Sequence, residues 1–241
     1  MAISQAELIS RTANVSYELY MDGSTIFPSV RLAQAILETG GQVPFWNNIF
    51  GIKVGTGEKT PYWDGRYVNR TTREVIDGQV HNDVVAQWRY YDSIEDCVRD
   101  HELFLQKPRY AAVRAASSPE RQCHALYAAG YATDAPAEVD GDPSYGEKLW
   151  SVIRSRGFVR YDEEAVRLKQ DILLRLSALE SIMGEMQQKS LALEGQNRLA
   201  DVPQWSQAAV NQAVARGLVD TPEGGSYDFY RFLTVLHRRG L

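Results

Sequence analysis

A stretch punctuated by glycines, residues 51–91, interrupts a chain that otherwise shows helical periodicity. Within it lie short β-prone runs separated by turn residues, a pattern typical of a small antiparallel hairpin region. Apolar residues recur at helical spacing before this stretch and again from Ser93 onward. Helices, a short β lobe and further helices in that order predict an α+β fold. The expected strand segments are 67–68, 74–76 and 84–88.

Local signals predict where the helices begin and end. Ser4 and Glu7 form a capping-box pattern for a helix that reaches about Tyr20. Pro28 suits the first turn of a second helix, which the Gly40-Gly41 pair ends. Further helices are expected over 93–105, 119–129 and 144–156.

Composition narrows the classes of function. The 241 residues include 26 Lys and Arg against 31 Asp and Glu, without a basic stripe, so nucleic acid is not an expected partner. No apolar run approaches the ~20 residues of a membrane helix. Cys97 and Cys123 do not form a disulfide framework, and the four scattered histidines do not predict a metal site. No cofactor is expected either.

The character of the chain changes after Tyr161. Apolar residues from Ile172 to Leu193 follow alternating steps of four and three, a heptad pattern with polar interruptions at Ser190 and Asn197. Two roles stay open for this helix: packing on its own domain, or homo-oligomer formation through 165–200. The expected organisation is a catalytic domain (1–160), a helical heptad linker (161–200) and a small helical module (201–241). Residues 201–205 are expected to cap the first helix of this module.

Glu38 is the residue that most suggests chemistry. It occupies the last turn of an otherwise apolar helix, where the negative end of the helix dipole disfavours a charged carboxylate and tends to raise its pKa. A carboxyl group that stays protonated near neutral pH is what a general acid for glycosidic cleavage requires. The ordinary alternative for such a residue is a solvated surface glutamate.

Ordered motifs over about residues 25–155 resemble the bacterial glucosaminidases of glycoside hydrolase family 73. The segment Pro28–Gly40 is similar to the catalytic-helix motif of that family, and Asn47–Lys53 resembles its "NNLFGIK" stretch. Three later segments resemble its "YDS…DH…FL…RY", "AGYATD" and "P.Y..KL" motifs: 91–110, 129–134 and 143–149. Residues 135–142 depart from the family pattern by lengthening a loop between the last two motifs.

The resemblance implies a lysozyme-like fold and an enzyme that cuts the β-1,4 bond after N-acetylglucosamine in peptidoglycan. Glu38 matches the general acid of the family. Glu74 matches the "T.E…G" hairpin that supplies a second carboxylate, and Asp64 and Asp77 in the same lobe are its rivals. Tyr131 matches a catalytic tyrosine of the cleft, with a core aromatic as the alternative role.

Substrate contacts are expected at five positions: Asn48, Phe50, Tyr110 and Asp134, which lie in the matched motifs, and Trp63, whose ring is suited to stacking on a sugar face. Aromatic rings stack well on sugar faces, so Trp46 and Trp88 are additional candidates for the same task, although tryptophan is also a common core residue. The expected partner is the glycan strand of peptidoglycan.

The C-terminal segment, 201–241, resembles a single S-layer-homology repeat, with Tyr230-Arg231 in place of the usual Thr-Arg. No signal-peptide pattern opens the sequence, which favours a protein that stays in a host cytoplasm until release, as a phage lysin or a phage-tail lysin does. The alternatives are a lytic transglycosylase or muramidase, and a non-catalytic wall-binding assembly protein.

Overall fold

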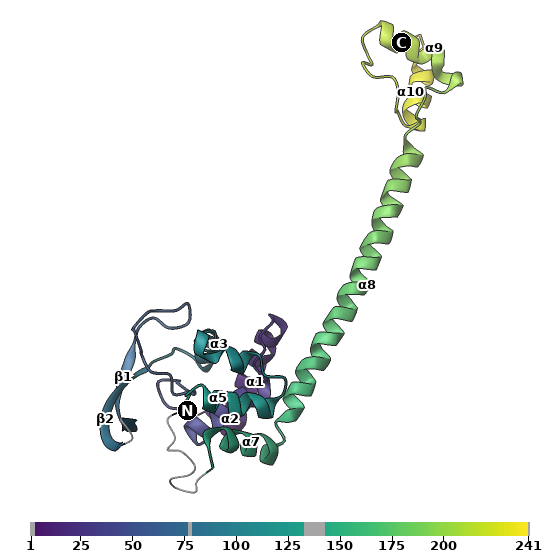
Figure 1. Cartoon of the computed structure of the whole chain (residues 1–241). Coiled ribbons are helices and arrows are strands. Elements are labelled where there is room, and N and C mark those ends of the chain that lie inside the picture. The colour runs from purple at the N-terminus through teal and green to yellow at the C-terminus, as the bar shows by residue number, and fades with distance from the viewer. Residues whose placement is uncertain (1–2, 77–78, 133–142, 241) are drawn as a thin grey trace. The chain divides into compact units, whose positions relative to one another are not determined.

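The computed structural model describes residues 3–76, 79–132 and 143–240 (Figure 1). The chain divides into two compact units, residues 1–170 and 171–241. The division falls inside one continuous helix, α8 (Val159–Asn197). None of the described helices combines the length and apolar character needed to cross a bilayer.

The first unit consists of a helical body with a two-stranded antiparallel sheet at one side, which confirms the predicted α+β class (Figure 1). Every helix expected before residue 157 is present within one or two residues of its predicted ends. Two short elements had no periodic signal: the 3-10 turn η1 (Pro108–Tyr110) and α4 (Ala111–Arg114). The remaining elements of this unit are α1 (Gln5–Met21), α2 (Pro28–Thr39), β1 (Tyr67–Ile76), β2 (Gln79–Arg89), α3 (Ile94–Leu105), α5 (Pro119–Ala128) and α7 (Tyr145–Arg156).

Helix α2 forms the centre of the core. Every residue from Pro28 to Ile36 is buried, and the helix packs against α1, α5 and α7. The terminal backbone groups of a helix have no partner within the helix, so other parts of the chain must bind them where water is excluded. At the C-terminal end, Gly40 adopts the left-handed conformation and the Thr39 hydroxyl accepts from the Gly41 amide at 3.0 Å.

The N-terminal end of α2 is capped from a distant part of the chain. Asp162, in the first turn of α8, accepts a 2.8 Å hydrogen bond from the Ser29 amide. Burial raises the pKa of the Asp162 carboxyl from 3.8 to about 6, even though the bond from Ser29 opposes the shift. This carboxyl therefore takes up its proton in the folded state at a higher pH than in the unfolded chain.

Asp162→Asn is expected to stabilise the fold at neutral pH. The protonated form of Asp162 stabilises the fold fully below about pH 4, and this contribution is lost as pH rises through about 6. An asparagine carries no charge and keeps an oxygen for Ser29, so the free energy of unfolding at pH 7.5 should rise by about 1 kcal/mol. Urea unfolding at pH 4 and pH 7.5 measures the effect. An equal rise in the free energy of unfolding at the two pH values would contradict this assignment. A rise of similar size in the variant of the exposed neighbour, Glu163→Gln, would also contradict it.

The β hairpin is held to the helical body by a buried ion pair. A two-stranded sheet is marginal by itself, so it needs such an anchor. Arg89, at the end of β2, donates to Asp100 of α3 at 2.7 Å. The hydroxyls of Tyr91 and Thr60 donate to the same carboxylate at 2.6 and 2.7 Å. This shared acceptor fixes the hairpin and the loop before it against α3.

The strands are longer than the β-prone runs in the sequence. Tyr67 pairs with Arg89 at one end and Ile76 with Gln79 at the other, with an irregularity in register between Thr72 and Glu74. Strand pairing recruits the intervening polar residues, which carry no strand signal of their own. Residues 51–66 form turns and isolated bridges in place of further strands.

The second unit contains most of α8 and a small helical module. In this module α9 (Gln207–Ala215) and α10 (Tyr227–Arg238) pack against each other. Their shared core consists of Ala209, Val210, Ala213, Tyr230 and Leu233. The prediction that residues 201–205 cap the first helix is wrong: a 3-10 turn, η2 (Gln204–Ser206), precedes α9, and no side chain caps it. The Ser206 amide instead donates to the Pro203 carbonyl at 2.9 Å.

Tyr230 has a structural task in this module. Its side chain is fully buried, and its hydroxyl donates to the Pro222 carbonyl at 2.7 Å and accepts from the Gly225 amide at 3.1 Å. These bonds close the loop between α9 and α10, which accounts for a tyrosine at this position.

Candidate active site

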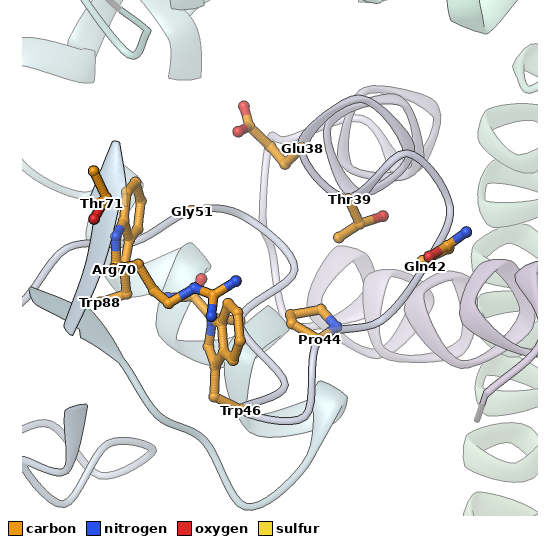
Figure 2. A pocket seen from close by; sticks show the side chains of 10 residues that line it. Glu38, Thr39, Gln42, Pro44, Trp46, Gly51, Arg70, Thr71 and Trp88 are labelled. Carbon is orange, nitrogen blue, oxygen red and sulfur yellow. The ribbon is translucent and has the colours of Figure 1, made fainter. Parts of the chain in front are cut away.

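The C-terminal end of α2 opens into a cavity of about 290 Å³. Figure 2 shows Glu38 projecting from the helix toward this space, with Trp46, Arg70 and Trp88 on the opposite wall. The helix, the loop that follows it and the hairpin each contribute a wall. The lining residues are Glu38, Thr39, Gln42, Pro44, Trp46, Asn48, Gly51, Arg70, Thr71 and Trp88.

Glu38 is oriented by a chain of hydrogen bonds from inside the protein. The Tyr145 hydroxyl donates to Glu38 Oε1 at 2.8 Å and lies 3.3 Å from Gln34 Nε2, which donates to it. Because the Gln34 amide supplies one hydrogen, the hydroxyl proton of Tyr145 is directed to Glu38. Burial raises the pKa of Tyr145, and the nearby Glu38 charge adds to the effect, so the phenol stays protonated.

This arrangement distinguishes the two oxygens of Glu38. Oε1 is occupied as an acceptor from Tyr145, so a proton held by the carboxyl group belongs on Oε2. Oε2 faces Gly51, where an added Cβ would lie only 3.2 Å away. Gly51 has a φ of 63°, a conformation that glycine adopts without strain. The glycine thus lets the loop approach the carboxyl group closely.

Asn48 holds the loop that carries Gly51. Its amide donates to the carbonyls of Ile52 and Arg89 at 2.8 and 3.0 Å, and its oxygen accepts from the Ile52 amide at 2.9 Å. The side chain is buried although it lines the cavity. Its hydrogen bonds to the backbone make it a brace between the loop and β2, where the motif implied a substrate contact.

Tyr131 lies beneath the site. Its hydroxyl donates to the Phe50 carbonyl at 2.9 Å, and its ring stacks on Tyr145 with centroids 5.8 Å apart. Burial raises its pKa, with the Glu38 charge as a further cause, so this phenol also stays protonated. Tyr131 therefore supports both Tyr145 and the loop at Phe50.

Two tryptophans form the aromatic wall that the sequence suggested. The Arg70 guanidinium lies over the Trp46 ring at 5.0 Å, and the Lys53 ammonium lies 5.4 Å from the Trp88 ring centroid. The cations hold the rings in place through cation–π attraction, and Arg70 adds positive charge to the cavity that Glu38 lines. Arg70 carried no signal in the sequence, because one arginine in a polar strand is ordinary.

Three predicted substrate-binding side chains are buried away from the cavity. Phe50 stacks on His101 with centroids 4.0 Å apart, and Trp63 lies under the Arg89 guanidinium at 4.1 Å. Tyr110 is fully buried beside Tyr131. Their burial gives these aromatic rings a packing role in place of the predicted substrate contact.

The acidic candidates of the β lobe differ in their surroundings. Asp64 is absent from the cavity lining and accepts from Arg66 at 3.0 Å through the backbone and 2.6 Å through the side chain. These bonds lower its pKa. Glu74 lies on β1, the strand that also brings Arg70 to the cavity, and pairs with His81 across the hairpin. Asp77 and Asp134 lie outside the described residues.

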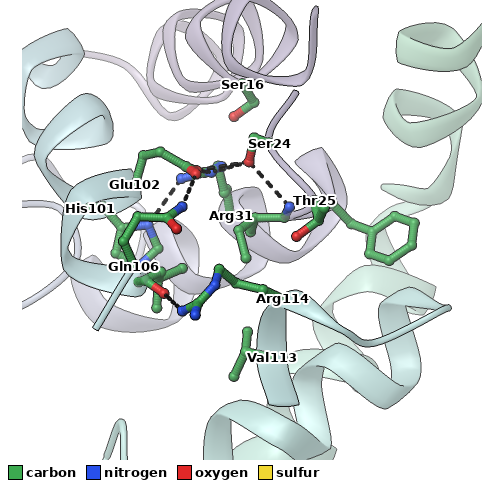
Figure 3. Close-up of polar contacts among 12 residues, drawn as sticks. Ser16, Ser24, Thr25, Arg31, His101, Glu102, Gln106, Val113 and Arg114 are labelled. Carbon is green, nitrogen blue, oxygen red and sulfur yellow. Dashed lines mark hydrogen bonds and ion pairs between the residues drawn. The ribbon is translucent and has the colours of Figure 1, made fainter. Parts of the chain in front are cut away.

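A buried polar network supports the N-terminal part of α2 (Figure 3). Arg31 forms an ion pair with Glu102, and its guanidinium lies 3.2 Å from His101 Nδ1. Burial and the adjacent Arg31 charge lower the pKa of His101, so this histidine is neutral at physiological pH. Because Phe50 stacks on the His101 ring, the network holds the same loop that Asn48 and Tyr131 hold. Histidine in this position is a packing partner, not an acid–base group.

No group of three or more His, Cys, Asp or Glu residues suited to a metal ion occurs within the described parts of the chain. The cavity lining supplies one oriented carboxyl group, two aromatic rings and the Arg70 cation. This set suits protonation of an oxygen in a polar, ring-shaped substrate.

Comparison with known proteins places this site in a family. Residues 15–157 match the glucosaminidase family, described as mannosyl-glycoprotein endo-beta-N-acetylglucosaminidase. This match covers more than half of the chain and includes α2, the hairpin and Tyr145. The chain belongs to the glucosaminidase family. Its first unit contains a glycoside hydrolase domain, and the predicted lysozyme-like fold is confirmed.

Relatives of this glucosaminidase domain include peptidoglycan hydrolase FlgJ of Salmonella typhimurium, 37% identical over 132 residues, which cover 51% of this chain and 37% of FlgJ. A probable N-acetylmuramidase of Lactococcus lactis subsp. cremoris is 29% identical over 175 residues, covering 67% of this chain and 36% of that protein. The matched regions thus span little more than a third of these relatives. A peptidoglycan hydrolase mutant from Sphingomonas sp. A1 superposes with a TM-score of 0.52 at 29% identity, covering 66% of this chain and 97% of that chain.

Tyr145→Phe tests the orientation of Glu38 in this glucosaminidase site. The substitution keeps the ring stacked on Tyr131 and removes the hydroxyl that donates to Glu38. We expect kcat to fall about 10- to 100-fold with KM nearly unchanged, because the acid is misplaced while the cavity walls remain. Steady-state kinetics on soluble glycan fragments measure the split. Tyr17→Phe, which removes a tyrosine hydroxyl on α1, is the control. An increase in KM with kcat unchanged would contradict the positioning role.

Proposed function

We propose that this protein hydrolyses the glycan strands of peptidoglycan at the β-1,4 bond after N-acetylglucosamine. The observation that carries the proposal is the single oriented carboxyl group of Glu38 at the edge of a cavity walled by Trp46 and Trp88. Membership of the glucosaminidase family supports the reaction, and the names of the FlgJ and Sphingomonas relatives support the substrate.

In the proposed mechanism the sugar rings stack on Trp46 and Trp88, and Glu38 donates the proton on Oε2 to the glycosidic oxygen. Tyr145 remains bonded to Oε1 and holds the carboxyl group in one rotamer. As the bond breaks, positive charge develops on the sugar ring. Glu74 of β1 is the proposed second carboxylate, which activates the attacking water or stabilises this charge.

A cut after N-acetylmuramic acid is the second candidate, because one relative is named a probable N-acetylmuramidase. Mass spectrometry of digested, borohydride-reduced cell walls distinguishes the candidates. Reduced N-acetylglucosamine ends support the proposal. Reduced muramic acid ends indicate a muramidase, and 1,6-anhydro ends a lytic transglycosylase; either result overturns the proposed bond specificity. Intact walls would indicate a binding or assembly protein.

We further propose that the enzyme is a phage lysin or tail lysin that reaches the wall after release, and that residues 201–241 act as an S-layer-homology-like wall-binding module. The resemblance of this segment and its exposed ring pair Trp205–Tyr227, with centroids 5.4 Å apart, support wall contact. Cosedimentation of the Glu38→Gln protein with purified walls, with and without residues 201–241, tests the module. Equal binding by both would contradict it. Homo-oligomer formation through 165–200 is also proposed and is argued next.

A further inference from the structure

Helix α8 carries an apolar stripe that no other element of the second unit covers. Every side chain from Asp171 to Leu193 is exposed, including Leu179 at 56% and Met183 at 68%. Surface leucines occur singly in most proteins, but a continuous stripe of this kind is typical of an interface. The stripe consists of Ile172, Leu176, Leu179, Met183, Met186 and Leu193.

The spacing of the stripe assigns heptad positions along α8. Leu176 and Met183 take position a, and Ile172, Leu179 and Met186 take position d. The flanking charges then separate by sign. Within residues 171–193 the charged residues at position g, Arg175 and Lys189, are basic, and the charged residue at position e, Glu180, is acidic.

We propose that α8 pairs with α8 of a second copy of this chain as a parallel, in-register coiled coil. In that arrangement each g residue meets the e residue five positions later in the partner. Arg175 then faces Glu180 of the partner, and the same attractive contact forms in each direction. Arg175 also lies 3.8 Å from Asp171 of its own helix, an exposed pair that leaves the guanidinium accessible to a second carboxylate.

An antiparallel pair lacks this attraction. There e residues face e residues and g residues face g residues, so Arg175 does not meet Glu180 of the partner. The charge pattern therefore favours a parallel second copy as the occupant of the stripe. This inference does not depend on the substrate, since it concerns α8 alone.

Light scattering and sedimentation equilibrium of the full-length chain test self-association. We expect a dimer at micromolar concentration. Leu179→Glu, on the stripe, should give a monomer, whereas Leu174→Glu should leave the dimer intact because Leu174 takes position f, away from the partner, and is 72% exposed. A monomeric wild-type chain, or equal dissociation by the two variants, would overturn the proposal.

Cysteine cross-linking tests the parallel orientation. Ile172 lies near one end of the stripe, so Ile172→Cys places two thiols opposite each other only when the helices are parallel and in register. The native Cys97 and Cys123 are buried and serve as the unreacted background in the wild-type chain. Rapid disulfide formation in Ile172→Cys under mild oxidation supports the orientation. A dimer that fails to cross-link would contradict it.

Charge reversal tests the assigned pairs. Glu180→Lys places a cation against Arg175 of the partner in both directions and should raise the dimer dissociation constant about tenfold at low salt. The double variant Arg175→Glu, Glu180→Lys restores opposite charges and should recover most of the affinity. If the double variant does not recover affinity, or if the dimer dissociation constant of Glu180→Lys is unchanged, the assigned pairing is wrong.

Discussion

Glu38→Gln is expected to lower kcat by about a thousandfold or more. General acid catalysis contributes roughly 10²–10⁴ to the rate of such reactions, and the amide keeps the shape of the carboxyl group but cannot supply the proton. Glutamine can still accept from the Tyr145 hydroxyl, whose bond to Glu38 is 2.8 Å long in the native chain. Folding and binding should therefore change little.

The measurement is release of reducing ends from purified cell walls, accompanied by thermal unfolding and cosedimentation with the walls. Glu163→Gln is a matched control, because Glu163 is exposed on α8 and does not line the cavity. If Glu38→Gln keeps more than a few per cent of the wild-type activity, Glu38 is not the general acid. A large loss in Glu163→Gln would point to a general charge effect instead.

Glu74→Gln is expected to lower kcat by about a hundredfold. A second carboxylate activates water or stabilises positive charge on the sugar, and its loss is partly offset where the substrate acetamide assists. Glu74 lies on β1 four residues beyond Arg70, which lines the cavity, so the hairpin is the element that would bring an acid toward the substrate.

Asp64→Asn is the matched control within the β lobe. The Asp64 carboxylate is bound by Arg66 and is absent from the cavity lining, so its amide variant should keep nearly full activity. The same wall-digestion assay compares the two variants. If Asp64→Asn is the more damaging change, the alignment of the hairpin motif is wrong, and the second carboxylate lies earlier in the lobe.

Local sequence signals were sufficient for most of the secondary structure. Ser4 caps α1 by accepting from the Glu7 amide at 3.1 Å, as its capping pattern predicts. Pro28 opens α2 and the left-handed Gly40 ends it, as expected. These features depend on residues within one helical turn, so the chemistry of neighbours decides them. The position of Glu38 in the last turn of an apolar helix follows for the same reason.

The details of the site depend on contacts between residues far apart in the sequence, which short-range sequence patterns do not predict. Tyr145 reaches Glu38 across 107 residues of sequence, and Asp162 caps α2 from 133 residues beyond Ser29. In the sequence Tyr145 is only one position of a motif, whereas in the structure its buried phenol decides which oxygen of Glu38 holds the proton.

The helices, the hairpin, the glucosaminidase motifs and Glu38 as the candidate acid can all be predicted from the amino-acid sequence. Which of the matched side chains face the cavity depends on long-range packing. Trp46 and Trp88 line the cavity, whereas Trp63 packs under Arg89. A tryptophan serves equally well in a core or in a sugar-binding wall, so its residue type does not distinguish the two roles. The roles of these three tryptophans differ because the Arg89–Asp100 ion pair fixes the hairpin on α3, and that long-range packing selects which ring is covered and which remains open to a sugar.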